Sequence, residues 1–299
     1  MPEPAPQAKP PAISVVIASQ DTRAALCGCL ERLAGQTQLV PAELIVVDAS
    51  TDGSAEIAGR AFPQVQVIHC PPGTLVPVLW QEGLEAARAP IVAFTLAQCL
   101  PSEQWLQAIL AAQAQGAAAV AGPLSGPSRG DAVAWAVYFA RYSAWMPPGP
   151  SSPVLHDLPG DNSAYRRAAL EPCRVHWQGG FWETPVNACL TARGERLAWA
   201  AQMQVEYTAG IGLGPFVRAR FVHGRHYAST RFAARPLARL IHFAGAPLLM
   251  PLLLARIWRR VRERRPDWLP HFWTALPALI VFMTAWALGE ASGYLLPEK

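Results

Sequence analysis

The chain reads Val46-Val47-Asp48-Ala49-Ser50-Thr51-Asp52-Gly53-Ser54 where a short β-branched run ends in an acidic loop, and this stretch decides the fold. Around it, short β-branched runs alternate with longer helix-like stretches from Ile13 to about Leu124. This β-α-β-α order predicts an α/β fold with a mainly parallel sheet and helices on both faces. In such sheets the ligand crevice lies beyond the carboxyl ends of the strands, so the residues that follow each strand are site candidates. The expected strands are Ile13–Ile17, Glu43–Asp48, Val65–His69, Ile91–Thr95 and Ala117–Gly122.

The end of the first strand disfavours one other nucleotide-binding fold, and the lysine content excludes a second. The first strand ends in Ala18-Ser19-Gln20-Asp21, which has no glycine, so the G-x-G-x-x-G turn of a nicotinamide-binding domain is missing. The only lysines are Lys9 and Lys299, so a P-loop with its G-K-[ST] ending is excluded, and the kinase and GTPase classes with it.

Asp48 is a carboxylate at the mouth of the predicted crevice. Because a carboxylate only accepts hydrogen bonds, Asp48 suits the imide N–H of uracil or the hydroxyls of a ribose. Asp52 and Ser54 have an alternative explanation, since either can cap the helix expected at Ser54–Phe62. Capping explains Asp48 less well, because it precedes that helix by several residues.

The chain resembles the family-2 glycosyltransferases, whose GT-A domain opens with a V-V-I strand and continues to a V-V-D-x-S-x-D-G-[ST] segment. The matching segments are Val15–Ile17, Val47–Ser54, Gly83–Ala87, Val92–Thr95 with Pro101 and Trp105, and Gly160–Arg167. The resemblance covers about Ile13 to Tyr207. It implies a GT-A domain that holds a nucleotide-diphosphate sugar and transfers the sugar to an acceptor.

The resemblance also implies roles for individual residues. The implied donor-binding residues at or after the strand ends are Asp48, Ser50, Asp52 and Gln98, and the implied acceptor-binding residues are Asp161, Asn162 and Trp182. Glu183 falls where the family keeps the carboxylate that deprotonates the acceptor hydroxyl. An inverting transfer needs such a base within hydrogen-bond reach of the nucleophile. Alternatively, Glu183 is a first-turn carboxylate that the dipole of the following helix favours.

The chain departs from the family at its metal site. The family holds a divalent cation on the diphosphate with a D-x-D motif, where this chain has Leu96 and Gln98, and Tyr207 replaces a histidine of many relatives. Three explanations are open: the enzyme works without Mg²⁺ or Mn²⁺, it binds metal through atypical ligands, or it has lost catalysis. We favour the first explanation, that the enzyme works without a metal ion, and we assign no cofactor.

Without a metal, arginines would neutralise the leaving diphosphate, because a guanidinium is always charged and grips phosphate in a bidentate manner. The candidates are Arg218, Arg220 and Arg225, which lie where the family often places a mobile basic segment. The alternative is that these arginines only face a membrane surface.

The cysteines show no spacing typical of a zinc site or of a disulfide framework, so we expect buried or incidental free thiols. They are Cys27, Cys29, Cys70, Cys99, Cys173 and Cys189. The proline-rich residues 1–12 have no apolar run that would act as a signal peptide, and we expect them to be disordered. The GT-A domain, residues 13–214, is therefore expected in the cytoplasm.

Composition points to a membrane. Hydrophobic residues make up 52% of the chain and charged residues 15%, which is more apolar and less charged than an average soluble domain. Residues 215–265 hold twelve arginines and one acidic residue, beside the uncharged stretches 240–255 and 272–289. Arginines beside such stretches favour anionic lipid head groups over nucleic acid as the partner.

The two uncharged stretches differ in length. Phe272–Gly289 has tryptophans nearby and is long enough, with a few more residues, for a spanning helix, so residues 266–299 are expected to contain one. The other stretch is shorter and holds Pro247 and Pro251, so residues 215–265 are expected to be interfacial or re-entrant. The positive-inside rule then keeps the catalytic domain on the cytoplasmic side of the inner membrane and puts Lys299 outside. Buried core helices are the alternative for both stretches.

The sequence thus predicts a membrane-associated inverting glycosyltransferase whose partners are a nucleotide-diphosphate sugar and a lipid or lipid-linked acceptor. The alternative is a catalytically inactive GT-A-like module that binds nucleotide-sugars or acts as a scaffold, because Leu96 and Gln98 replace carboxylates. A nucleotidyltransferase is disfavoured because it would want a glycine-rich, basic first loop. The aromatic run Trp135–Pro148 is expected to pack in a core rather than to line an acceptor groove.

Overall fold

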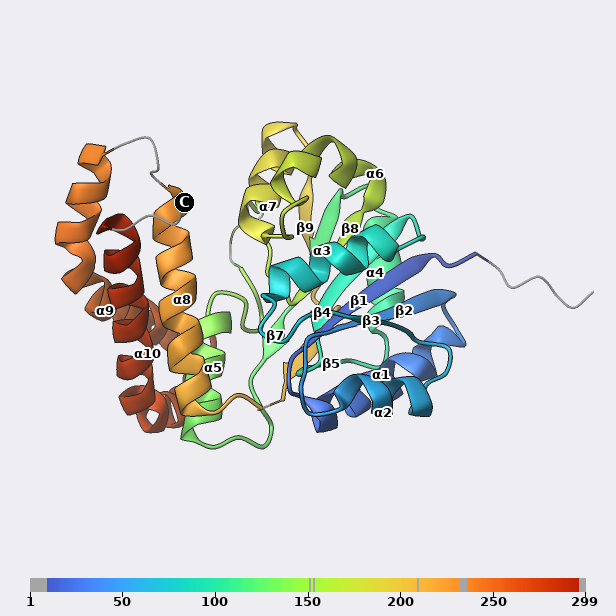
Figure 1. Ribbon diagram of the computed structural model, residues 1–299, viewed down its shortest axis with the longest axis horizontal. Coiled ribbons are helices and arrows are strands. Elements are labelled where there is room, and N and C mark those ends of the chain that lie inside the picture. The colour runs from blue at the N-terminus through green and yellow to red at the C-terminus, as the bar shows by residue number, and fades with distance from the viewer. Residues whose placement is uncertain (1–9, 151, 153, 209, 232–235, 296–299) are drawn as a thin grey trace, which may run out of the picture. The chain divides into compact units, whose positions relative to one another are not determined.

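The computed structural model describes residues 10–150, 152, 154–208, 210–231 and 236–295 (Figure 1). Most of the N-terminus that we expect to be disordered, and Lys299, lie outside these residues. The chain divides into two compact units. The sheet unit comprises Met1–Ser125 and Pro148–Thr208, and the helical unit comprises Gly126–Pro147 and Ala209–Lys299. Residues 126–147 therefore group with the C-terminal helices, although they fall within the range expected for the GT-A domain.

The sheet unit is built on a seven-stranded sheet in the order β3-β2-β1-β4-β8-β6-β9. The strands are β1 (Ile13–Ser19), β2 (Ala42–Asp48), β3 (Gln66–His69), β4 (Ile91–Leu96), β6 (Ala119–Ala121), β8 (Asn162–Arg166) and β9 (Leu197–Trp199). All neighbouring pairs are parallel except those of β8, which is antiparallel to β4 and to β6. A second sheet joins β5 (Cys99–Pro101), β10 (Val205–Tyr207) and β7 (Leu124–Ser125). The predicted fold class, a mainly parallel α/β sheet, is confirmed.

Helices cover both faces of this sheet. They are α1 (Arg23–Thr37), α2 (Ser54–Ala61), α3 (Val76–Ala86), α4 (Trp105–Gln113), α6 (Arg167–Leu170) and α7 (Glu183–Ala192), with the 3₁₀ helix η1 (Glu171–His176). Figure 1 shows α3 on the opposite face from α1 and α2. All seven residues of β1 are buried, as expected for a strand covered on both faces. Gly83 lets α3 approach β1 closely, because a Cβ there would overlap the side chain of Val16.

The helical unit consists of α5 (Ala132–Tyr142), α8 (Leu213–Arg231), α9 (Pro236–Arg264), η2 (Pro266–Trp268) and α10 (Leu269–Leu295). Helices α8 and α10 run parallel, because Phe216 packs on Phe282 while Gly293, further along α10, faces the backbone of Arg225. Helix α9 runs the opposite way, since Arg239 near its start donates a hydrogen bond to the Tyr294 carbonyl oxygen. The end of α9 and the starts of α8 and α10 therefore lie toward the same end of the unit.

The aromatic run of α5 packs in the core of the helical unit. Trp135, Tyr138 and Phe139 are buried, and the ring of Trp135 stacks on His271 with centroids 4.2 Å apart. Trp268 packs against both Trp135 and Tyr138. The prediction that these aromatic residues pack in a core is confirmed.

Both apolar stretches are helical. Helix α9 runs without a break through Pro247 and Pro251, and Leu237–Arg264 and Pro266–Leu295 are each long and apolar enough to cross a membrane. These properties alone do not separate a membrane span from a core helix of a soluble protein. The sequence had suggested that the first stretch is too short to cross a membrane. The helix that contains it is long enough, so the expectation that residues 215–265 are interfacial or re-entrant no longer rests on length.

The prediction of free thiols is wrong for two of the six cysteines. Cys173 and Cys189 form a disulfide with their Cα atoms 6.0 Å apart. The two cysteines are 16 positions apart in sequence, a spacing with no signature of its own. The packing of η1 against α7 brings them within bonding distance. Cys27, Cys29, Cys70 and Cys99 are free.

We expect the Cys173→Ser variant to lose about 3 kcal/mol of unfolding free energy, because the disulfide closes a loop of about 15 residues in the unfolded chain. Chemical denaturation of the oxidised protein measures this loss. Cys27→Ser, at a free and partly exposed thiol, is the control and should unfold like the wild type. Alkylation of the unfolded wild type without reductant should label four thiols; labelling of all six would contradict the disulfide.

Candidate functional site

The candidate site lies along one edge of the main sheet. In the strand register, Ser19 pairs with Asp48 and Ala18 pairs with Leu96, so β1, β2 and β4 end together. The antiparallel β8 begins at the same edge, because Asn162 pairs with Thr95. The loops after β2 and β4 and the loop before β8 therefore line this edge, which is where open α/β sheets bind ligands.

Asp48 ends β2 and is held by its own loop. The side chain is 3% exposed, and its carboxylate accepts hydrogen bonds from the backbone N–H of Ser50 at 3.2 Å and from Ser50 Oγ at 2.7 Å. Ser50 Oγ in turn accepts a hydrogen bond from the backbone N–H of Asp21 at 2.8 Å. These bonds fix the loop after β2 to the loop after β1.

Asp21 is a site-edge residue that the sequence analysis did not single out. Its φ is +49°, a left-handed conformation that is uncommon for a residue other than glycine. Its carboxylate accepts a hydrogen bond from the backbone N–H of Thr51 at 2.7 Å. Asn and Asp are enriched in this conformation, so an aspartate two positions after β1 was the available sequence signal.

The Asp52 side chain accepts hydrogen bonds at the starts of two helices, which agrees with the capping alternative that the sequence left open, although Gly53 is the N-cap residue of α2. Its carboxylate accepts hydrogen bonds from the Ser54 backbone N–H at 3.0 Å, from the Ser54 hydroxyl, and from the Arg23 backbone N–H at 3.2 Å. Burial raises the pKa of Asp52, but these hydrogen bonds outweigh it and hold the pKa below its usual range. Asp52 thus joins the starts of α1 and α2.

The residues at the family's metal position do not fit a divalent cation. Leu96 is a buried hydrocarbon, and Gln98 is 6% exposed with its backbone oxygen accepting hydrogen bonds from Thr208. Within the described part of the chain, no group of three or more His, Cys, Asp or Glu side chains is arranged to hold a metal ion. Hard cations such as Mg²⁺ and Mn²⁺ prefer carboxylate oxygens, which this position lacks.

Asn162 is buried and used within the protein. Its Oδ1 accepts a hydrogen bond from Trp105 Nε1 at 2.8 Å, and its Nδ2 donates to the carbonyl oxygens of Met203 at 2.8 Å and Pro123 at 3.1 Å. These bonds tie the main sheet to the segments that carry the smaller sheet. Its neighbour Asp161 is 6% exposed.

Glu183 is the first residue of α7 and lies at the same sheet edge as Asp48. It is partly exposed, and its Cδ would lie 3.3 Å from a Cβ placed on Gly160, two residues before β8. The same Cβ would lie 2.5 Å from the ring of Trp80, so only glycine fits between that indole and the carboxylate. Trp182, also partly exposed, precedes Glu183.

A chain of hydrogen bonds holds the first turn of α7. Asp157 accepts from Thr184 Oγ1 at 3.1 Å and from Asn187 Nδ2 at 2.7 Å. The buried Asn187 also accepts from the Tyr165 hydroxyl at 3.0 Å. Burial raises the pKa of Tyr165, and the charge of Glu183 raises it further, so this carboxylate lies within electrostatic reach of the hydroxyl. The sequence analysis did not identify this network.

The three candidate arginines lie on α8 in the helical unit. Arg218 is exposed, whereas the Arg220 guanidinium lies 4.0 Å from the centroid of the Trp286 ring on α10. Arg225 is partly buried, and its backbone faces Gly289 and Gly293.

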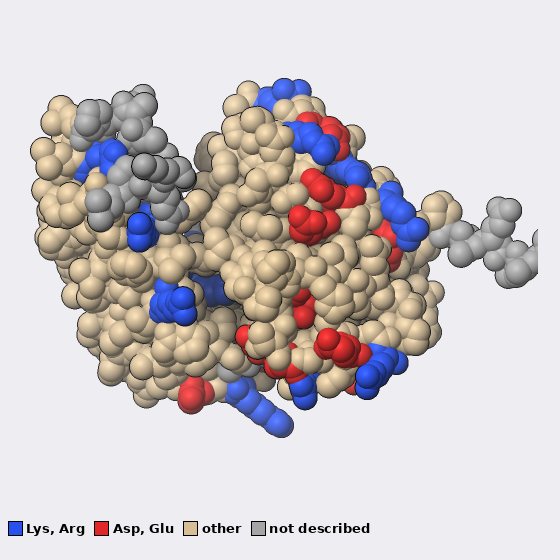
Figure 2. Space-filling view, viewed as in Figure 1, with Lys and Arg blue, Asp and Glu red and all other residues tan. Residues whose placement is uncertain are grey.

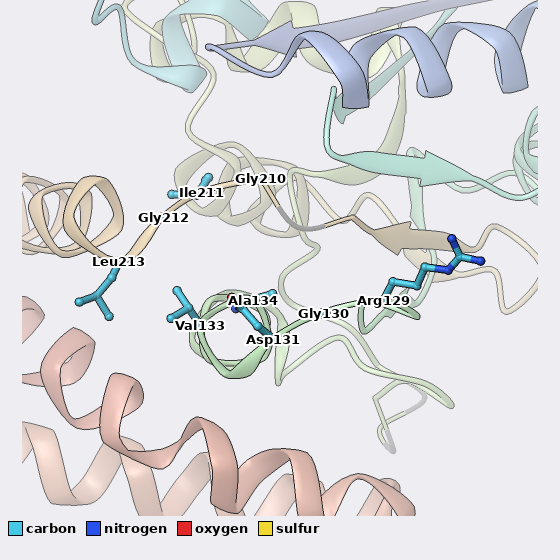
Figure 3. A pocket seen from close by; sticks show the side chains of 9 residues that line it. All are labelled: Arg129, Gly130, Asp131, Val133, Ala134, Gly210, Ile211, Gly212 and Leu213. Atoms are coloured by element: carbon cyan, nitrogen blue, oxygen red, sulfur yellow. The ribbon is translucent and has the colours of Figure 1, made fainter.

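A hollow of about 500 Å³ lies in the helical unit between the starts of α5 and α8 (Figure 3). Its lining is Arg129, Gly130, Asp131, Val133, Ala134, Gly210, Ile211, Gly212 and Leu213. The Arg129 side chain points away from the other labelled side chains, and Asp131 caps α5 by accepting from the Ala134 N–H at 2.8 Å. None of the predicted donor or acceptor residues lines this hollow.

The family model for glycosyl transferase family 2 matches residues 14–173, more than half of the chain. Those residues carry the strand ends at which Asp48 and Gly160 lie. The chain therefore belongs to glycosyl transferase family 2, and the protein is a glycosyltransferase. No curated protein matches the chain.

Among the solved structures that are similar to the chain are three with TM-scores below 0.5. One is a mannosyltransferase from Pyrobaculum calidifontis in complex with GDP-Man and Mn²⁺, at 17% identity and TM-score 0.48, covering 98% of this chain and 76% of that one. Another is TarS 1–349 from S. aureus, at 13% identity and TM-score 0.49, covering 91% and 89%. The third is a glucosyl-3-phosphoglycerate synthase from Mycobacterium tuberculosis in complex with phosphoglyceric acid, at 18% identity and TM-score 0.45, covering 68% and 72%. Likeness at this level does not define a substrate.

Proposed function

We propose that the protein transfers a sugar, with inversion, from a nucleotide-diphosphate sugar to a lipid or lipid-linked acceptor at a membrane. The observation that carries this proposal is the placement of Asp48 and Glu183 along one sheet edge, with the ends of β1 and β4 between them. Three strand spacings separate β2 from β8, about 14 Å in total, so an extended ligand has room between the two carboxylates. Membership of the family supports the reaction class.

In the proposed reaction, an acceptor hydroxyl attacks the anomeric carbon of the sugar and gives its proton to the carboxylate of Glu183. The bond between that carbon and the diphosphate oxygen breaks, and the nucleoside diphosphate leaves with the bonding electrons. Attack from the face opposite the leaving group inverts the anomeric configuration. A base that is positioned in this way typically contributes 10²- to 10⁴-fold to the rate.

Asp48 and Ser50 are the proposed contacts for the nucleoside. The carboxylate of Asp48 accepts two hydrogen bonds from Ser50 and has capacity for about four, so it can also accept from a ribose hydroxyl or a base N–H. On the acceptor side we propose Asp161 and Trp182. We leave Asp52 and Asn162 out of the ligand contacts, because hydrogen bonds within the protein already use their side chains.

We propose that the leaving diphosphate is neutralised by arginine rather than by a metal ion. Leu96 and Gln98 supply no carboxylate at the family's metal position. Arg218, which is exposed on α8, and Arg225 remain the candidates. Arginine suits this role because its charge is permanent and its planar donors match two phosphate oxygens.

The helical unit supports the proposed membrane association. Helices α9 and α10 are about 44 and 40 Å long, more than the about 30 Å of a bilayer core. Helix α9 exposes apolar side chains along its first part and arginines toward its end, in the order Leu237, Leu240, Ile241, Leu248, Leu252, Arg256, Arg259 and Arg262. The exposed Glu263 pairs with Arg259. On the face drawn in Figure 2, most of the visible surface of these helices is uncharged.

We propose that α8 and α9 form a re-entrant pair and that α10 is the single span. The opposite directions of α8 and α9 return the chain to the end at which it entered, and the arginines at the end of α9 favour the cytoplasm for that end. The disulfide between Cys173 and Cys189 argues the other way for the catalytic domain, because disulfides are rare in the cytoplasm.

A catalytically inactive module that binds nucleotide-sugars is the second candidate function. The observation that favours it is Leu96, which cannot ligate a cation where the family places a carboxylate. Melting temperatures measured with a panel of UDP- and GDP-sugars identify a donor under either function, since a ligand of the folded state raises stability by mass action. A turnover assay with that donor distinguishes the two functions, because only the enzyme transfers the sugar.

Once the melting-temperature panel has identified the donor, we expect Glu183→Gln to lower kcat by about 10²- to 10⁴-fold. The reason is that an amide cannot take the proton of the acceptor hydroxyl. The donor-induced rise in melting temperature should be retained, since Glu183 does not contact the nucleoside. Glu171→Gln, an exposed acid in an ion pair with Arg174, is the control and should keep the wild-type rate. Wild-type turnover in Glu183→Gln would overturn the assignment of the base.

We expect turnover to survive a chelator such as EDTA unchanged, because the residues at the metal position supply no carboxylate. Initial rates are measured before and after chelation and again with added Mg²⁺ or Mn²⁺. Activity that is lost in EDTA and returns only with one of these ions would show that the metal binds through atypical ligands.

A reporter enzyme that is active only outside the cytoplasm should be active when it is fused after Lys299 and inactive when it is fused after Arg265, in the arginine-rich turn. Two fusions with the opposite pattern would place the catalytic domain outside. Inactivity at both positions would mean that α10 does not cross.

A further inference from the structure

The helical unit brings together Arg141 from α5 and Arg220 from α8, and we call these two arginines the cationic cluster. His223 of α8 lies beside them. Burial, followed by the charges of Arg220 and Arg141, lowers the pKa of His223 to about 4. Arg141 also acts on Arg220, so the three side chains share one neighbourhood. The residues Arg141, Arg220 and His223 are all partly exposed, although the Nε atom of Arg220 is buried.

The position of Arg220 is fixed by aromatic rings. Its guanidinium lies 4.0 Å from the Trp286 centroid and 5.8 Å from the Phe216 centroid. Phe216 itself packs on Phe282, with the ring centroids 4.6 Å apart. A guanidinium that is stacked in this way keeps its donor edge in a defined plane, which suits bidentate binding of an oxyanion.

Glu290 is an acid whose charge acts on Arg220, and its carboxylate has hydrogen bonds of its own. Glu290 accepts hydrogen bonds from Trp286 Nε1 and, at 3.2 Å, from the Tyr294 hydroxyl. Arg220 Nε is buried and has no hydrogen-bond partner within the part of the chain that the structure describes. A buried charged donor without an acceptor costs free energy, and an anion that supplies oxygen atoms removes this cost.

The surroundings of the cluster select an amphiphilic anion. Phe221 and Val222, which lie between Arg220 and His223 in the sequence of α8, are exposed apolar side chains, and Leu288 on α10 is 59% exposed. A ligand that places a phosphate among the basic groups can therefore lay a hydrocarbon chain along the same helices. A free nucleotide offers no such chain.

We propose that the cationic cluster binds the phosphate group of a lipid, either a bilayer phospholipid or a lipid-linked acceptor. This inference rests on the membrane association proposed above. It assigns Arg220 to the lipid side of the protein rather than to the donor diphosphate.

The first test measures binding without any sugar transfer, so a failure of the proposed catalysis does not affect it. The full chain in neutral detergent is titrated calorimetrically with farnesyl phosphate and with farnesol. We expect the phosphate to bind at least tenfold more tightly than the alcohol. Arg220→Gln and Arg141→Gln should each remove most of this preference, and Arg220→Lys should retain part of it. Arg129→Gln, an exposed arginine of the same unit, is the matched control.

Two further arms identify the source of the phosphate. Flotation with phosphatidylcholine vesicles, with and without phosphatidic acid, reports on bilayer head groups, and titration with UDP and GDP reports on the donor. If the glutamine variants lose only the binding of farnesyl phosphate, the site takes a lipid-linked acceptor. If they lose only the dependence of vesicle binding on phosphatidic acid, the site takes a bilayer lipid. The proposal would be overturned if the two glutamine variants bound farnesyl phosphate and phosphatidic acid vesicles as the wild type does. A loss confined to UDP or GDP would do the same, because the cluster would then belong to the donor.

If Arg220→Gln unfolds, its melting temperature reveals this, and Arg141→Gln carries the test alone. Wild-type preference for the phosphate in a folded Arg141→Gln would then count against the cluster.

Discussion

The candidate site depends on one geometric constraint, the common edge at which β2, β1 and β4 end and the antiparallel β8 begins. Parallel strands that are joined by helices bring their carboxyl ends to one side of a sheet, whatever the loops contain. The reversed β8 then adds the start of its own strand to that edge, with Gly160 just before it. Because Glu183 packs on Gly160, the constraint places it on the same edge as Asp48, although 134 residues separate the two acids in sequence.

The sequence predicted the parts of this arrangement that follow from local pattern. Strands that are buried on both faces read as continuous runs of β-branched residues, so Ile13–Ile17 and Glu43–Asp48 were visible as strands and Asp48 as a strand end. The reversal of β8 has no such signal, because a single short strand reads alike in both directions. Only the resemblance to a family pointed to Glu183.

The roles of the polar residues near the edge could not be separated from sequence. Asp52 and Asn162 lie in segments typical of ligand binding, yet their side chains serve the protein itself. For Asn162 the partners are Trp105 and Met203, 57 and 41 residues away, and only tertiary packing brings such groups together. A polar side chain that is buried must find a partner, and the sequence does not state whether that partner is a ligand or the backbone.

The indications about compartment conflict, and the hydrogen bonds of α7 resolve part of this conflict. Arginines favour the cytoplasm, where thiols stay reduced, whereas the disulfide of Cys189 with Cys173 favours an oxidising compartment. The disulfide anchors α7 at Cys189, near the end of the helix, while Asp157 holds its first turn through Thr184 and Asn187. Since Glu183 begins that first turn, its position depends on the hydrogen bonds more directly than on the disulfide. A reduced protein in the cytoplasm would therefore be less stable but would keep the carboxylate at the sheet edge.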